Sequence, residues 1–394
     1  MATFCMQTLG CEVSAIHTVN YSRQLRYTVG VAVSNHPLLG NHVAYRRFKG
    51  RKTPAEEVSE LYQGLKDAGL DQFDMMLSGY CPSASTVEQV GKIARELKFQ
   101  ATTKPGSFFW VLDPVMGDNG RIYVAEDTVP VYKNLLKDAD LILPNQFEAE
   151  LLSDVKIHDL TSMKQAITKL HQAHQLPHIL ITSIQLPQST SSTPSKTEED
   201  LAATAKLTII GSTSTSDNKP RLFRITVPAL PIFFSGTGDM FAALMVSRLR
   251  KAAADACLLG TQAWKSPDDV PATELPLAQA AEKVLASMHA VLKDTEAQYD
   301  AAVKKLQHDQ QHSLAEGQGP EKEAEVEAQR HLRLTRAAEI RVVRNARALR
   351  EPPILDDFRA HAVEVVEEVE GHVNAPDELG VVKVASGEGA VHQT

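Results

Sequence analysis

FFWVLDPVMGD (Phe108–Asp118) begins as an unbroken apolar run and turns polar only at Asp113. A strand with one face in water alternates apolar and polar residues, so a run without alternation predicts a strand that is covered on both faces. Three further segments behave in the same way, with helical patterns between them: FDMMLSGY (Phe73–Tyr80), ADLILPNQFEAELLS (Ala139–Ser153) and HILITS (His178–Ser183). Strands that alternate with helices predict the α/β class, here a three-layer α/β/α sandwich with a mostly parallel central sheet.

Polar side chains gather where these predicted strands end. In open α/β sheets, ligands bind beyond the carboxyl ends of the strands. The residues found there are Tyr80, Asp113, Asp118, Asn145, Glu148, Thr182 and Ser183. The sequence therefore predicts a single cleft lined by these side chains.

The bulk composition excludes several classes of protein. The 394 residues carry a net charge of −8, which gives no basic footprint for a nucleic acid. No apolar run reaches the ~18 residues of a membrane span, and the first residues show no secretory pattern. The four cysteines form no CxxC pair, which is typical of a reducing compartment. We expect a cytoplasmic protein without membrane or nucleic-acid partners, with entry into the nucleus left open.

Composition also predicts the domain boundaries. We expect a single domain over residues 1–350, which includes a charged, Gln-rich segment at 298–329 that is typical of a solvated helix or a disordered insert. Residues 351–394 are acidic and then rich in small residues, which predicts a partly disordered C-terminal extension.

SGTGDMFAALMVSRL (Ser235–Leu249) carries the strongest chemical signal. Gly-Thr-Gly predicts a tight turn before a helix, where backbone N–H groups and the helix dipole favour an anion such as a phosphoryl group. Asp239 lies in the first helical turn, where its charge would repel a phosphate. Accepting a proton from an attacking hydroxyl gives this carboxylate a reason to be there. The alternative is an ordinary capping acid beside a pair of loop glycines.

Two upstream motifs favour phosphoryl transfer. DPVMGD places Asp113 and Asp118 five residues apart after one strand, and PNQFEAE places Asn145 and Glu148 after the next. Phosphoryl transfer uses Mg²⁺, which binds to a few carboxylates, waters and phosphate oxygens. A single Asp after a strand is more often a turn residue, but three motifs at successive strand ends make that reading less favourable than phosphoryl transfer with a divalent cation.

The set DPVMGD, LPNQFEAELLS, ITS and FFSGTGDMFAALM closely resembles the eukaryotic, fungal-type pyridoxal kinases of the ribokinase-like superfamily. The resemblance runs from Met1 to about Val246 and returns at Leu332–Leu349. Related hydroxymethylpyrimidine phosphate kinases share DPVM but typically carry Cys at the position of Asp239. The resemblance implies a ribokinase-like fold and phosphorylation of the 5′-hydroxymethyl group of pyridoxal, and also of pyridoxine and pyridoxamine, with ATP as the donor.

The resemblance also implies the roles of single residues. Asp239 is the catalytic base, and the anion hole for the γ-phosphate is formed by Gly236, Thr237 and Gly238. The ATP-binding residues are Asp113, Asn145, Glu148, Thr182, Ser183, Leu230, Pro231, Ile232 and Thr237. The residues that line the B6 substrate are Val19, Tyr21, Val43, Tyr80, Gly238 and Asp239. Asp118 and Glu148 order the divalent cation, a monovalent cation such as K⁺ binds near Asp118, and the family forms homodimers.

The chain departs from the family pattern in two places. Family members usually open with a β-strand and a segment like SHVVHGYVGN before a stretch resembling MATFCMQTLG (Met1–Gly10), so the comparison implies a missing central strand and a missing serine at the B6 ring. The residues Arg23–Gly40 match nothing in the pattern, which indicates a retained intron, with a genuine surface loop as the alternative. Val43 and Ala44 also replace the usual Thr-Gly beside the substrate.

These departures leave two alternatives to an active pyridoxal kinase. One is an inactive relative, because the loss of a central strand would cost several kcal/mol of stability. The other is a kinase of a related hydroxymethyl heterocycle that keeps the same fold.

Overall fold

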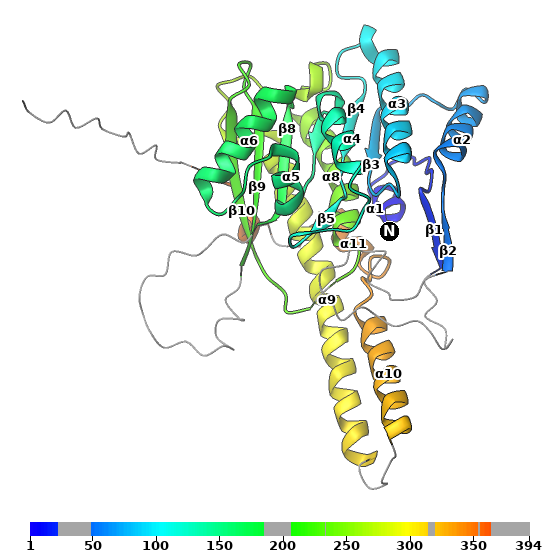
Figure 1. Cartoon of the computed structure of the whole chain (residues 1–394). Coiled ribbons are helices and arrows are strands. Elements are labelled where there is room, and N and C mark those ends of the chain that lie inside the picture. Colours follow the sequence, from blue (N-terminus) through cyan, green and yellow to red (C-terminus); the bar gives the residue numbers. More distant parts are fainter. Residues whose placement is uncertain (23–48, 185–205, 233, 314–319, 354, 364–394) are drawn as a thin grey trace, which may run out of the picture. The chain divides into compact units, whose positions relative to one another are not determined.

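The computed structural model describes residues 1–22, 49–184, 206–232, 234–313, 320–353 and 355–363 (Figure 1). One compact unit runs from Met1 to Glu364, so it continues beyond residue 350, where composition places the domain boundary. The unmatched segment Arg23–Gly40 and Val43 lie outside the described residues.

A mixed sheet forms the centre of the described fold (Figure 1). Its strands, in spatial order, are β11 (His361–Ala362), β10 (Pro220–Pro228), β9 (Lys206–Ser214), β8 (His178–Ile184), β7 (Leu141–Ile142), β4 (Phe109–Leu112) and β3 (Met75–Ser78). β3, β4, β7 and β8 are mutually parallel and confirm the four predicted strands. β9, β10 and β11 continue the sheet through antiparallel pairs, and the β9–β10 hairpin is not among the predicted elements.

The sheet is covered on both faces, as the unbroken apolar runs predict. In β4, Phe109 and Val111 belong to one apolar cluster and Trp110 and Leu112 to another, and none of the four is more than 1% exposed. Side chains alternate between the two faces of a strand. The first cluster is completed by α1 (Ala2–Thr8), α8 (Thr237–Asp255) and α9 (Pro276–Ser313). The second is completed by α2 (Ala55–Asp67), α3 (Ala84–Gln100), α4 (Thr128–Leu135), α5 (Gln146–Ser153) and α6 (Leu160–His174). These layers confirm the predicted sandwich.

β3 lies at one edge of the sheet. Among the described residues it pairs only with β4, and no strand covers its other side. α1 packs nearby against α8, where Cys11 Sγ lies 2.9 Å from Ser247 Oγ. In a separate two-stranded sheet, β1 (Val19–Ser22) pairs antiparallel with β2 (Lys49–Lys52), and a short hairpin joins β5 (Gly117–Asp118) to β6 (Arg121–Ile122).

The charged segment at 298–329 is helical in its described parts. α9 continues through Ser313, and α10 (Pro320–Ala337) packs back against it (Figure 1). No described helix combines the length and the apolar character that spanning a membrane requires.

The chain returns to the sheet after α11 (Ala346–Arg350) through a segment that we call the C-terminal strap (Leu355–Val363). The strap contains a short 3₁₀ helix, η5 (Asp356–Phe358), and then β11. β11 pairs with β10, and the Val363 N–H donates to the Leu222 carbonyl at 3.2 Å. This part of the predicted extension therefore belongs to the sheet.

Candidate active site

Helix α8 begins at the predicted phosphate turn. Gly236 has a φ of 95°, a left-handed conformation that glycine adopts without steric cost. A Cβ added at Gly236 would lie 2.7 Å from the Met1 Cε atom, whereas one added at Gly238 would meet nothing within 4 Å. The turn thus places Thr237 and Gly238 beside open space at the positive end of the helix dipole.

Two cavities meet at Asp239. The larger has a volume of about 870 Å³ and the smaller about 400 Å³. Tyr80, Asp113 and Asp239 line both of them. A carboxylate at this junction lies within reach of ligands from both sides, which is the arrangement that group transfer between two ligands needs.

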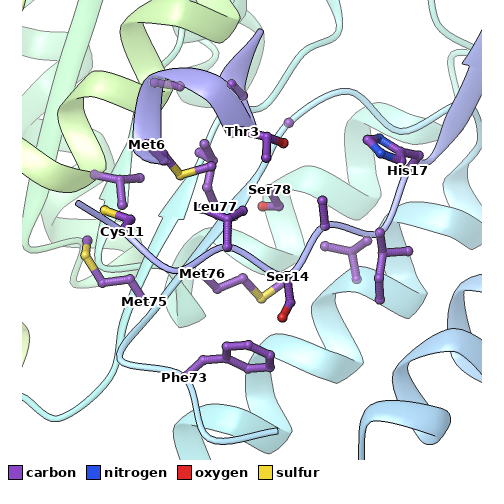
Figure 2. Close-up of a pocket in the computed structure, with 18 of the residues that line it drawn as sticks. Thr3, Met6, Cys11, Ser14, His17, Phe73, Met75, Met76, Leu77 and Ser78 are labelled. Atoms are coloured by element: carbon purple, nitrogen blue, oxygen red, sulfur yellow. The ribbon is translucent and has the colours of Figure 1, made fainter. Parts of the chain in front are cut away.

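The larger cavity lies between the N-terminal residues and the edge strand. α1 and the stretch from Cys11 to His17 form one side, and Phe73–Ser78 form the other (Figure 2). Val19 and Tyr80, two of the residues expected at the B6 substrate, line this cavity. The Thr18 hydroxyl donates to the Tyr80 carbonyl at 2.7 Å, which fixes the loop after β3 against this wall.

The smaller cavity has a polar end and an apolar end. The polar end contains the predicted strand-end residues together with the α8 turn: Asp113, Asp118, Asn145, Glu148, Thr182, Ser183, Thr237 and Gly238. The apolar end is lined by Leu207, Ile209, Val227, Pro228, Leu230, Ile232, Phe234, Leu285, Met288, His289 and Leu292. This division suits a ligand with a charged group at one end and an apolar ring system at the other.

Glu148 connects the motif DPVMGD to the motif PNQFEAE through hydrogen bonds. Its Oε1 accepts from the backbone N–H groups of Met116 at 2.8 Å and Gly117 at 3.3 Å, and its Oε2 accepts from the Asn145 N–H at 2.9 Å. The Asn145 side chain completes a capping box on α5 and donates through Nδ2 to the Gly117 carbonyl at 2.7 Å. The hydrogen bonds of both side chains therefore hold the loop after β4 against the start of α5.

Asp113 and Asp118 keep more of their acceptor capacity. The Asp118 Oδ1 accepts from the Asn119 N–H at 2.8 Å. The Asp113 carboxyl is only 9% exposed, and it accepts no hydrogen bond from the described residues. Burial, and then the charges of Glu148 and Asp239, raise the pKa of Asp113 well above its usual range. Burial also raises the pKa of Asp118, and it raises the pKa of Glu148 to about 7.

These carboxylates fit a bound cation. Oxygen donors are the ligands of Mg²⁺, which commonly binds to one or two carboxylates together with phosphate oxygens and water. Within the described part of the chain, no three acidic, His or Cys side chains could hold a metal ion by themselves. Beside Asp239, the smaller cavity contains Asp113 and Asp118, whose carboxylates accept fewer hydrogen bonds from the described residues than Glu148 does.

Strand β8 contributes two further polar residues to the polar end of the smaller cavity. Thr182 forms an isolated parallel bridge with Asn145, and its N–H donates to the Pro144 carbonyl at 3.0 Å. Ser183 has a φ of 56° within an irregularity of the β8–β9 pairing. A left-handed serine is strained, and such strain is concentrated at functional sites.

The structure thus brings most of the predicted residues together. Asp113, Asp118, Asn145, Glu148, Thr182, Ser183, Leu230, Ile232, Thr237, Gly238 and Asp239 line the smaller cavity, and Val19 and Tyr80 line the larger one. Gly236 and Pro231 line neither cavity, although Gly236 shapes the turn. Tyr21 lies in β1, but its side chain is not described, and Val43 lies outside the described residues.

Other lining residues were not foreseen. Tyr123, which follows β6, reaches the smaller cavity, and burial raises the pKa of its phenol far above the usual value. A face of α9 also contributes, beginning at Leu285. Its spacing is visible in the sequence as a helical apolar stripe, but such a stripe alone does not tell a core face from a cavity wall.

The sequence is similar to those of known proteins. Residues 79–254 match the model of a family described as phosphomethylpyrimidine kinase. The Sus scrofa pyridoxal kinase is 33% identical over 303 residues, which cover 75% of this chain and 77% of that one. The Homo sapiens pyridoxal kinase is 31% identical over 307 residues, which cover 75% and 79%.

Solved structures agree on the fold. A Leishmania donovani pyridoxal kinase in complex with ADP and pyridoxine has a TM-score of 0.62 and 24% identity, with 91% of each chain covered. A Plasmodium falciparum structure with AMP-PNP and PL has a TM-score of 0.59 and 21% identity, with 92% of each covered. The acidic motifs, the glycine turn with Asp239 behind it, and the sequence similarity along three quarters of the chain lead to one conclusion: this chain belongs to the pyridoxal kinase family.

Proposed function

We propose that this chain is an active pyridoxal kinase, which transfers the γ-phosphoryl group of ATP to the 5′-hydroxymethyl group of pyridoxal, pyridoxine or pyridoxamine. The observation that carries the proposal is the place of Asp239, at the junction of a larger cavity and a smaller one that ends in polar groups. The nucleotide occupies the smaller cavity, with its phosphates at the polar end and its base at the apolar end. The B6 ring occupies the larger cavity beside Tyr80.

Asp239 acts as the general base. Its carboxylate accepts the proton of the 5′-hydroxyl, the hydroxyl oxygen attacks the γ-phosphorus, and the bond from that phosphorus to the β–γ bridging oxygen breaks, which leaves ADP. The N–H groups of the turn at Gly236, Thr237 and Gly238 stabilise the charge on the transferred group. Such a base contributes about 10²- to 10⁴-fold to the rate.

Asp113 and Asp118 are the residues that would hold the divalent cation on the nucleotide phosphates, with Asn145 and Glu148 fixing the loop that carries them. When bound, Mg²⁺ neutralises phosphate charge. We propose a monovalent cation such as K⁺ near Asp118. The resemblance to the family also supports a homodimer, and the free state of all four cysteines supports a cytoplasmic location.

The test is pyridoxal-dependent ADP formation by the purified 394-residue chain with Mg²⁺ and K⁺, beside Asp239→Asn. Asp255→Asn is the matched control, because Asp255 lies at the other end of α8 and pairs there with Lys251. We expect kcat to fall about 10²- to 10⁴-fold in Asp239→Asn and to stay unchanged in the control. A folded, ADP-binding wild-type chain without turnover would refute the proposal and favour an inactive relative.

A second acceptor is tested in the same assay. The matched family model is described as phosphomethylpyrimidine kinase, and the larger cavity of about 870 Å³ exceeds the size of one small heterocycle. A hydroxymethylpyrimidine is therefore offered beside the B6 vitamers. A higher kcat/KM for the pyrimidine would assign the site to that substrate.

A further inference from the structure

One face of α9 forms a wall of the apolar end of the smaller cavity. The face consists of residues spaced three, four and seven positions apart, which is the spacing of one side of a helix: Leu285, Met288, His289 and Leu292. Three of the four side chains offer only carbon or sulfur to a ligand.

His289 differs from all the other described residues at this end. Their side chains carry no hydrogen-bonding nitrogen or oxygen, whereas the imidazole carries two ring nitrogens. Burial, and then the charge of Lys293, lower the pKa of His289, which favours the neutral ring. A neutral imidazole has one N–H donor and one bare nitrogen acceptor. The edge of a nucleobase offers donors and acceptors of the same kind.

Phe358 of the C-terminal strap holds this ring. The two ring centres are 5.4 Å apart at an interplanar angle of 53°, and Phe358 is only 2% exposed. Tilted ring pairs at this separation are attractive. The contact limits the positions that the imidazole can take at the cavity wall.

The strap itself is anchored to both walls of the cavity. Glu282 of α9 accepts from the Ala360 N–H at 2.8 Å and from the Arg359 guanidinium at 3.1 Å. β11 pairs with β10, whose far end carries Val227 and Pro228, which also line the cavity. The strap therefore connects a helix and a strand that both line the smaller cavity.

We propose that His289 hydrogen-bonds to the base of the bound nucleoside triphosphate and that Phe358 is a positioning residue that orients the His289 ring. The proposal rests on the proposed function in one respect, which is that the nucleotide occupies the smaller cavity. It adds a side chain that recognises the base and gives the strap a part in the nucleotide site.

The experiment compares His289→Leu and His289→Gln in the full-length chain. Leu keeps an apolar wall without hydrogen bonds, whereas the Gln amide keeps a donor and an acceptor. Lys283→Ala is the control, because Lys283 lies on α9 but lines neither cavity. Calorimetry gives the Kd for ADP, steady-state kinetics give KM for ATP and for pyridoxal, and thermal unfolding confirms that each variant is folded.

We expect His289→Leu to raise the Kd for ADP and the KM for ATP about 5- to 10-fold, the value of one hydrogen bond at a partly desolvated site. His289→Gln should recover part of this loss, and kcat and the KM for pyridoxal should stay within about twofold of wild type, because the base lies away from the reacting atoms. Phe358→Leu should raise the same two nucleotide constants, and Phe358→Tyr, which keeps the ring, should restore them.

Two results would overturn the proposal. One is a folded His289→Leu variant that binds ADP as tightly as wild type, and the other is an equal loss in the pyridoxal and nucleotide constants. Failure of the proposed function looks different: wild type binds ADP more tightly than His289→Leu does, yet phosphorylates no B6 vitamer. If Phe358→Leu fails to fold, the two His289 variants still decide whether His289 hydrogen-bonds to the base.

Discussion

His178 begins strand β8, whose other end places Thr182 and Ser183 in the wall of the smaller cavity. Its ring is 3% exposed, with Nε2 at 2.7 Å from the Ala263 carbonyl and Nδ1 at 2.9 Å from the Thr213 hydroxyl. A carbonyl can only accept, so Nε2 carries the proton and Nδ1 accepts from the hydroxyl. The neutral ring is fully hydrogen-bonded, and a second proton would place a positive charge in a buried site.

The magnitude of the pH effect follows from this arrangement. Burial lowers the pKa of His178 from 6.5 to about 3 in the folded chain. A lowered histidine pKa adds stability that is fully present above pH 6.5 and is lost as the pH falls from 6.5 toward 3. At about pH 5 the unfolded chain has bound the proton and the folded chain has not, which removes about 2 kcal/mol from the free energy of unfolding.

The assay is urea unfolding of wild type and His178→Gln at about pH 7.5 and about pH 5. At the higher pH we expect the variant to be less stable by about 1–3 kcal/mol, because Gln matches the two hydrogen bonds imperfectly. At the lower pH the gap should shrink by about 2 kcal/mol, since only wild type loses the histidine contribution. The carboxylates with raised pKa values change the free energy of unfolding with pH in the opposite direction. Their contribution is the same in wild type and in the variant, so it cancels when the two are compared. His308→Gln, on the exposed part of α9, controls for the loss of an imidazole. A gap that is the same at both pH values would refute the reasoning.

Two further predictions concern the loops of the site. Gly238→Ala should not lower the melting temperature, because its Cβ would meet nothing within 4 Å and alanine favours a helix over glycine, but should raise the KM for ATP about 10-fold by entering the phosphate space. Gly236→Ala should instead lower the free energy of unfolding by about 1–2 kcal/mol, because its φ is 95°; equal melting temperatures for the two variants would contradict this distinction. Glu148→Ala should cost about 3 kcal/mol or more in urea unfolding, since it leaves three backbone N–H groups without their acceptor. A loss below about 1 kcal/mol would mean that water replaces the carboxylate.

The sequence predicts the polar end of the site far better than the apolar end. Asp113, Asn145 and Asp239 each belong to a short motif whose local structure places the side chain at a strand end or in a first helical turn. His289 lies 50 residues after Asp239, and its place depends on how α9 packs against β9 and β10. Long-range packing of this kind leaves no local signal.

The same reason explains the remaining differences. The strap after residue 350 has the composition of a peripheral tail, and only the pairing of β11 with β10 makes it part of the sheet. By composition, the segment from 298 to 329 suits both a solvated helix and a disordered insert. In its described part, the continuation of α9 shows that it is helical.

Helix α9 has two halves with very different surroundings. From Leu277 to Val291 its apolar side chains, apart from Ala290, are at most 8% exposed, whereas five of the eight residues from Ala302 to Asp309 are exposed. Thr295 is fully buried at the border, where Asn345 Nδ2 also donates to Asp294 Oδ2 at 2.8 Å. Helical hydrogen bonds with little tertiary packing open locally at low cost. The far half of α9 packs against α10 rather than against the sheet, so these two helices can fray and re-form together as a separate cooperative unit, while the near half keeps its wall of the smaller cavity in place.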